Sequence, residues 1–152
     1  MAAYMITVQV DSNAVRLKLD AMPEAVRSGV KRTVGELAQT LRSHIANDKL
    51  LGQVLNRKTG HLGASLLWKV EDSAQGITGT VATGKNVPYA KIHEYGAVFD
   101  RLVTMAWGRP VKEPKMHTFH YPERSFMRTG LADMREDIVT TLRDAVMKAA
   151  KL

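Results

Sequence analysis

Two stretches of the chain repeat apolar residues at the spacing of an α-helix. The first, from Pro23 to about Asn47, carries one apolar stripe made of Val26, Val30, Val34, Leu37, Leu41 and Ile45. The second, from about Ser125 to Lys151, carries a stripe made of Leu131, Met134, Ile138, Leu142, Ala145 and Ala149. A stripe of this spacing is typical of a helix that buries one face, so the pattern predicts two long amphipathic helices.

Other stretches alternate apolar and polar residues, as a strand with one buried face does. The predicted strands are Tyr4–Val10, Leu66–Glu71 and Ile77–Thr83, with a short helix over Ala14–Asp20 and a hairpin loop, DSAQG, between the last two strands. Gly79, inside the last strand, indicates a bulge or a close neighbour. Residues 47–63 are rich in glycine and turn formers, so we expect a connection with at most one helical turn.

The segment VPYAKIHEYG, residues 87–96, predicts a short helix that starts after a proline and stops at a glycine. Three side chains at a spacing of three share one of its faces: Tyr89, Ile92 and Tyr95. We expect this face to dock against a neighbouring surface, while Lys91 and Glu94 point outward. The helix is therefore expected to serve packing and recognition rather than catalysis.

Residues 97–121 form the most unusual part of the chain. Two strand-like runs, Leu102–Trp107 and Met116–Tyr121, flank GRP and a charged tip that contains proline. The stretch is too long for an ordinary loop, and we interpret it as a hairpin arm at about 99–121. The whole chain, 1–152, is expected to be one α+β domain: two long amphipathic helices packed on a small antiparallel sheet, with a projecting β-hairpin arm.

Composition removes several classes of protein. Of 152 residues, 45% are hydrophobic and 24% are charged, as in an ordinary soluble globular protein. The lack of cysteine excludes disulfides, thiolate nucleophiles and cysteine-ligated metals. The opening MAAYMITVQV has no signal-peptide features, and no apolar run is long enough to span a membrane. We therefore expect a protein of a cytosol, or of an assembly built there.

Basic residues outnumber acidic ones by 22 to 15, which gives a formal charge of +7. Such a surplus favours contact with nucleic acid, an acidic protein surface or anionic lipid, and a basic solvated surface fits it equally well. Residues 101–128 concentrate the surplus, with six basic residues against two acidic ones and four aromatic residues among them. Such a mixture can bind single-stranded nucleic acid or form a protein interface.

We favour the protein interface, because the aromatic residues alternate with other residues as they do along a strand. The candidate interface residues are Tyr89, Ile92, Tyr95, Trp107, Phe119, Tyr121 and Phe126. No residue set indicates a catalytic, cofactor or metal site. His117 and His120 would point to opposite faces of a strand, and the chain has no His-Glu-x-x-His pair, nucleophile elbow or phosphate-binding loop. An enzyme is the least favoured class.

Three segments resemble one protein family. TGHLGASL (59–66) resembles its TG-x-L-x-x-S stretch, YAKIHEYG (89–96) its YA-x-x-x-E-[FY]-G block, and PERSFMR (122–128) its P-x-R-[PS]-F-[ML]-R entry to a closing helix. The family is the tail-completion or neck proteins of long-tailed bacteriophages, also described as head–tail joining, minor tail or virion morphogenesis proteins. The resemblance covers about residues 59–150, and three motifs in the family's order are far more specific than any one alone.

The resemblance implies a structural virion protein located at the neck and assembled in the host cytoplasm. Its copies are expected to form a ring of six subunits that joins the head-side connector, or stopper, to the tail terminator and tail tube around the DNA channel. The arm is longer than in shorter family members, and we expect it to be exchanged with a neighbour or to reach the next ring. Candidate charges facing the channel, its DNA or the next ring are Arg101, Arg109, Lys112 and Lys115. The alternative is a free basic nucleic-acid-binding module.

Overall fold

The computed structural model describes residues 24–56, 59–73 and 76–150. The strand expected over Tyr4–Val10 and the helix expected over Ala14–Asp20 lie outside these residues. The elements, in chain order, are α2 (Glu24–His44), η1 (Ile45–Gln53), α3 (His61–Ala64), β1 (Leu66–Ser73), β2 (Gly76–Thr83), α4 (Tyr89–Tyr95), β3 (Ala97–Ala106), β4 (Arg109–Tyr121) and α5 (Met127–Ala150). Helices and antiparallel sheets in one chain confirm the mixed α+β class.

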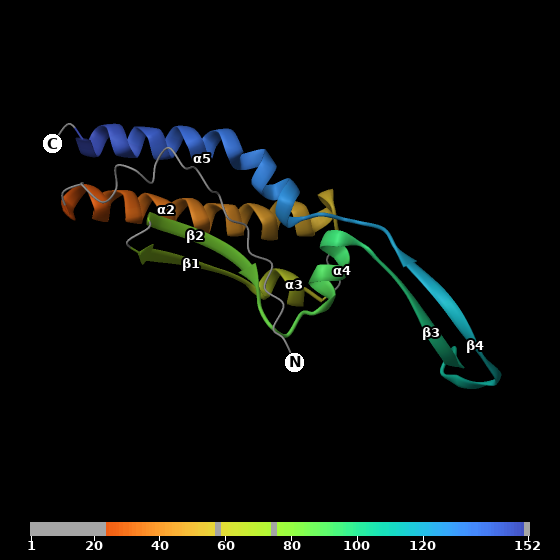
Figure 1. The fold of residues 1–152 in the computed structure, drawn as a ribbon. Coiled ribbons are helices and arrows are strands. Elements are labelled where there is room, and N and C mark those ends of the chain that lie inside the picture. Colours follow the sequence, from red (N-terminus) through yellow and green to blue (C-terminus); the bar gives the residue numbers. More distant parts are fainter. Residues whose placement is uncertain (1–23, 57–58, 74–75, 151–152) are drawn as a thin grey trace.

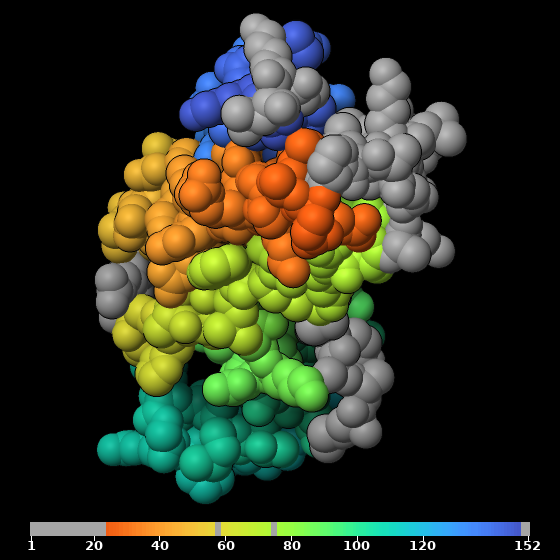
Figure 2. Space-filling model, turned by 90° about the vertical axis from the view of Figure 1, so that its left-hand side faces the viewer, coloured from red at the N-terminus to blue at the C-terminus, as the bar shows by residue number. Residues whose placement is uncertain are grey.

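The main body has three layers, in which α5 lies on α2 and α2 lies on the β1–β2 sheet (Figure 1). Figure 2 shows the same order from one end, with α5 in blue, α2 in orange and the sheet in yellow-green. The expectation that both helices pack on the sheet was wrong, because α5 packs on α2. Two strands about 5 Å apart are narrower than a helix about 10 Å in diameter, so this sheet has room for one helix only.

Glycines let α2 approach the sheet closely. A Cβ atom added at Gly79 of β2 would lie 2.9 Å from Cγ1 of Val34, and one added at Gly35 of α2 would lie 3.6 Å from Cγ2 of Val70. The close neighbour expected at Gly79 is therefore the helix α2. At each of these two contacts one of the facing residues is a glycine, and the missing side chain lets the helix backbone lie close to the sheet backbone.

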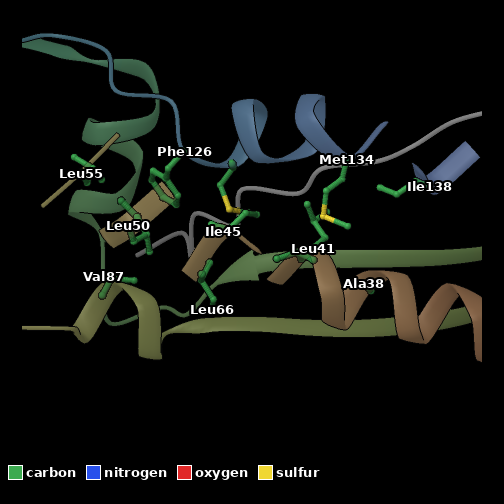
Figure 3. Close-up of a cluster of buried hydrophobic side chains, with 13 residues drawn as sticks. Ala38, Leu41, Ile45, Leu50, Leu55, Leu66, Val87, Phe126, Met134 and Ile138 are labelled. Carbon is green, nitrogen blue, oxygen red and sulfur yellow. The ribbon is translucent and has the colours of Figure 1, made fainter. Parts of the chain in front are cut away.

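The densest part of the core lies where α2 continues into η1, beside the start of α5 (Figure 3). Ile45 and Phe126 are fully buried, and Leu50 and Leu66 nearly so. Residues 47–53 were expected to be mainly loop, but they continue the helix as a π-helical segment. Burial of Leu50 favours the helical conformation over the turn that the local sequence prefers. The regular helical geometry stops at Leu51 and Gly52, near the end of η1, where Gly52 adopts φ = +126°.

An ion pair ties the first turn of α2 to the end of β1. Arg27 Nη2 lies 2.5 Å from Asp72 Oδ1, and Lys31 Nζ lies 3.5 Å from Asp72 Oδ2. The hydrogen bond from Arg27 is the main reason why the pKa of Asp72 lies below its ordinary value of 3.8. A carboxylate with a lowered folded-state pKa stabilises the fold above its unfolded-state pKa, and this stability is lost as the pH falls through the folded-state value.

We expect Asp72→Asn to lower the melting temperature slightly at pH 7, because the ion pair is partly exposed to solvent. The difference from the wild-type chain should shrink as the pH falls below 3.8, because the Asp72 carboxylate is protonated first in the unfolded chain and then, at lower pH, in the folded chain. Thermal melts monitored by circular dichroism between pH 2 and pH 7 measure this. Glu71→Gln is the matched control, because Glu71 is next in the chain and pairs with Lys69 of the same strand instead of with α2. A difference that is unchanged at low pH would contradict the assignment.

Candidate interaction hairpin and its anchor on the body

The β3–β4 hairpin extends away from the body, from α4 at its base to a free tip (Figure 1). Its register runs from Ala97 opposite Tyr121 to Ala106 opposite Arg109, and Trp107 and Gly108 make the turn. Both turn residues have positive φ, 54° and 74°, which matches the twist of a two-residue hairpin. The charged, proline-containing segment expected at the tip belongs to β4 instead, and the register shifts beside Val103.

Large apolar side chains are exposed on both faces of this hairpin. On one face Phe99 stacks on Phe119 and on Tyr121, with ring centroids 5.9 and 5.5 Å apart. On the other face, Val98 and Met116 are 65% and 63% exposed. They lie one residue from Phe99 and three residues from Phe119, and an odd spacing along a strand places side chains on opposite faces. A soluble protein rarely exposes so much contiguous apolar surface unless a partner covers it.

The outer part of the hairpin is basic. All four of the candidate charges lie there with exposed side chains: Arg101, Arg109, Lys112 and Lys115. With Glu113 as the one acidic residue between 101 and 115, this part carries a formal charge of +3. Trp107 at the tip is 101% exposed, as in a free chain. The hairpin therefore presents one indole and four cations beyond its apolar base.

The short helix α4 buries a different face from the expected one. Ala90 and Glu94 are buried, Tyr89 and Tyr95 are exposed, and Ile92 is half-buried. The expectation that Glu94 points outward was wrong. Its carboxylate is fully buried because a complete set of hydrogen-bond donors surrounds it, and such a set removes the usual penalty for burying a charge.

These donors come from the two residues before α5 and from its first turn. The Oε2 atom of Glu94 accepts hydrogen bonds from the backbone N–H groups of Phe126 and Met127, both at 2.9 Å. The Oε1 atom accepts from the Ser125 hydroxyl at 2.7 Å and from the Arg128 N–H at 3.1 Å. Free N–H groups and the positive dipole end of a helix favour an anion at this position, so a residue from α4 serves as the N-terminal cap of α5.

The Arg128 side chain completes the joint between α4 and α5. Its Nε donates to Glu94 Oε1 at 3.1 Å, and its Nη2 donates to the Glu94 carbonyl oxygen at 2.9 Å and to Glu123 Oε1 at 2.6 Å. The guanidinium also lies 5.0 Å from the ring centroid of Tyr95. The hydrogen bond to Glu94 is the main reason why the pKa of Arg128 is raised. Two of the segments used for the family resemblance thus form one contact.

Phe126 was expected at an interface, and the structure corrects this. Its side chain is fully buried in the core cluster that also contains Ile45 and Leu50 (Figure 3). The cause is the cap itself, because the bond from the Phe126 N–H to Glu94 holds this residue at the base of the helix, against the core. The other candidates, Tyr89, Ile92, Tyr95, Trp107, Phe119 and Tyr121, keep exposed or half-buried side chains.

Gly96 sets the direction in which the hairpin leaves the body. It has φ = 69° and ψ = 172°, a conformation open almost only to glycine. A Cβ atom there would lie 2.8 Å from the carbonyl oxygen of Tyr121 and 3.0 Å from the N atom of Glu123. The start of β3 and the end of β4 are therefore fixed against each other at this glycine.

A polar cluster that the sequence analysis missed lies between α2, η1 and α5. Lys49 Nζ is 2.5 Å from Asp133 Oδ2 and 3.0 Å from Gln53 Oε1. His44 lies 2.6 Å from Asp48 Oδ2 and 3.3 Å from Asp133 Oδ2. Only the spacing of four between His44 and Asp48 was visible in the sequence, because Asp133 comes from a distant helix. The bonds from Lys49 and then His44 lower the pKa of Asp133.

Next to this cluster, α2 and α5 enclose a shallow groove of about 480 Å³. Three carboxylates line it, from Asp48, Asp133 and Asp137, and none of the described residues that line it is Lys or Arg. Within the described residues, no group of three or more His, Asp or Glu side chains could hold a metal ion. The groove is thus an acidic surface on the face where the two long helices meet.

The chain matches no known family model, no curated protein sequence and no solved structure. None of the helices in the described ranges is long and apolar enough to cross a membrane. The class of this protein must therefore be inferred from the geometry above, together with the three segments that resemble neck proteins.

Proposed function

We propose that this chain is a structural, non-enzymatic protein of the neck of a long-tailed bacteriophage. In this role a ring of its copies, six by the family resemblance, joins the head connector to the tail terminator and tail tube around the DNA channel. The observation that carries the proposal is the β3–β4 hairpin, which has exposed apolar side chains on both faces and is held firmly at its base.

The hairpin supports an assembly role because of its two open faces. A two-stranded sheet is marginally stable alone, and its unpaired edges attract other chains. Side chains such as Val98 and Met116 on one face and Phe99 on the other are shielded only if partners lie on both sides. A subunit in a closed ring has a neighbour on each side, and a ring in a stack also has layers above and below.

The contact between Glu94 and α5 also supports the proposal. The YAKIHEYG and PERSFMR segments are two of the three segments that carry the family resemblance. They are in contact through Glu94, Ser125 and Arg128. Glu94 needs the donors at the start of α5 to be buried without penalty, so the two sequence segments are structurally coupled. This makes a chance match of two unrelated short motifs a weaker explanation of the resemblance.

Deletion of residues 100–119, with a two-glycine bridge, is expected to abolish head–tail joining. The shortened chain keeps Glu94, Gly96 and the buried core, so it should still fold as a monomer. In a phage that carries this deletion, electron microscopy should show filled heads and separate tails, and the virion yield should fall to background. Normal circular dichroism and cooperative melting of the purified variant control for misfolding. A normal yield of joined virions would overturn the proposal.

The alternative, a free nucleic-acid-binding module, draws on the formal charge of +3 on the outer hairpin. It can be separated from the neck role by titrating duplex DNA with the isolated monomer at several salt concentrations. Tight binding that falls steeply with salt would favour the alternative, because it reports many phosphate contacts. Weak binding, together with the presence of the protein at the neck of purified virions, would favour the neck role.

A further inference from the structure

The acidic groove and the basic hairpin tip have opposite charge. The groove of about 480 Å³ contains Asp48, Asp133 and Asp137, while the turn and the start of β4 carry Trp107, Arg109 and Lys112. Asp137 forms no ion pair with a described residue, so its charge is available to a partner. Lys49 pairs with Asp133, and the His44 imidazole contacts both Asp133 and Asp48. Three carboxylates against one lysine still leave this surface with a formal negative charge.

The groove also offers apolar contact. Met134 contributes to its lining and lies 9% exposed beneath it, with Thr40 and Ser43 at the side of α2. An aromatic side chain buries about 150–250 Å² when it is fully covered, and Trp and Arg are the residues most often found at the energetic centre of an interface. A tip with an exposed indole next to an arginine offers apolar and cationic contacts to a groove that contains one methionine and three carboxylates.

A chain cannot make this contact with itself in the observed fold. The hairpin leaves the body at α4 and points away from the α2–α5 layers, so its tip lies far from its own groove (Figure 1). Gly96 and the Glu94 joint fix that direction. The two complementary surfaces must therefore meet between different copies, and a contact between two different surfaces of identical copies can close a ring.

We propose that the hairpin tip of one copy, with Trp107, Arg109 and Lys112, docks into the α2–α5 groove of a second copy, against Asp48, Asp133 and Asp137. The proposal rests on the homo-oligomeric ring of the proposed function, and it names the surfaces through which the copies meet. DNA is disfavoured in the groove, because the carboxylates would repel its phosphates.

Charge reversal tests the contact. Asp137→Lys, and separately the double variant Arg109→Glu with Lys112→Glu, should each weaken self-association about tenfold or more, measured by analytical ultracentrifugation. A chain that carries all three reversals should regain association to within a few-fold of wild type, because the charges are complementary again. Glu136→Lys is the matched control, since it makes the same change one residue away and outside the groove. Its association should stay as in the wild type.

Disulfide trapping gives a second readout, since the chain has no cysteine of its own. A Lys112→Cys chain is mixed with an Asp137→Cys chain and oxidised, and the expected product is a mixed dimer that each chain alone does not form. A wild-type chain that stays monomeric and gives no mixed dimer would overturn the docking. So would rings that ignore the reversals, or a triple variant that fails to recover. If rings still form in the charge-reversal variants, the docking contact is wrong but the neck role stands. If the protein is absent from virions, the neck role is wrong, and the trapping experiment still tests the contact between copies.

Discussion

Replacing Glu94 by alanine is expected to lower the free energy of unfolding by about 3 kcal/mol or more, because a buried donor left without an acceptor costs about 1–3 kcal/mol and several donors at the start of α5 lose theirs. The change removes the acceptor of the N–H groups of Phe126, Met127 and Arg128 and leaves them without partners in the core. Urea unfolding measures the loss, and amide hydrogen exchange locates it at the start of α5.

Two variants sharpen this experiment. Glu94→Gln keeps the shape but brings a donor group to a site made of donors, so it should lose a large part of the same stability. Glu123→Ala, which removes the exposed partner of the same arginine, should cost less than about 1 kcal/mol. If Glu94→Ala were no worse than Glu123→Ala, the carboxylate would not be the cap that the geometry indicates.

Gly96→Ala is expected to cost about 3 kcal/mol and to misdirect the hairpin. The backbone conformation at Gly96 costs a non-glycine residue about 1–3 kcal/mol. The new methyl group would also lie 2.8 Å from the Tyr121 carbonyl oxygen, which is backbone and cannot move aside cheaply. Urea unfolding should show the loss, and head–tail joining should fall with it, because the hairpin would leave the body at another angle.

Gly108→Ala is the matched control for this change. Gly108 also has a positive φ, 74°, but a Cβ atom there would meet nothing within 4 Å. The substitution therefore carries only the backbone cost of about 1 kcal/mol. If the two variants lost equal stability, the close approach between β3 and the segment after β4 would contribute nothing.

The elements with a regular apolar pattern were predictable from the sequence. Val30 and Leu41 on α2, and Met134 and Ile138 on α5, are buried as their spacing required. The single apolar stripe of α5 is satisfied equally well by packing on α2 as by packing on the sheet. The layer order was not predictable in this way, because a stripe indicates which face is buried and not which element covers it. The narrow sheet decided that question.

For the candidate interface residues, exposure was predictable in part, and the interface itself stays a prediction. Tyr95 and Trp107 are exposed as an interface requires, but Phe126 belongs to the core and Glu94 points inward. A charged residue is normally assigned to the surface. The exception at Glu94 depends on a helix terminus more than 30 residues later in the chain, at a distance of 31 to 34 positions from its donors. Local patterns carry no signal for such a contact.

The joint at Glu94 has a mechanical consequence. In the proposed neck role, tension on the tail or pressure inside the head would act on each subunit through its β3–β4 hairpin. At the base of the hairpin, Glu94 and Arg128 bond α4 directly to the start of α5, and Gly96 packs against the beginning of segment 122–126, which joins β4 to α5. Force applied at Trp107 would thus travel into the longest helix of the body, which resists extension, and the subunit would move as a lever instead of stretching.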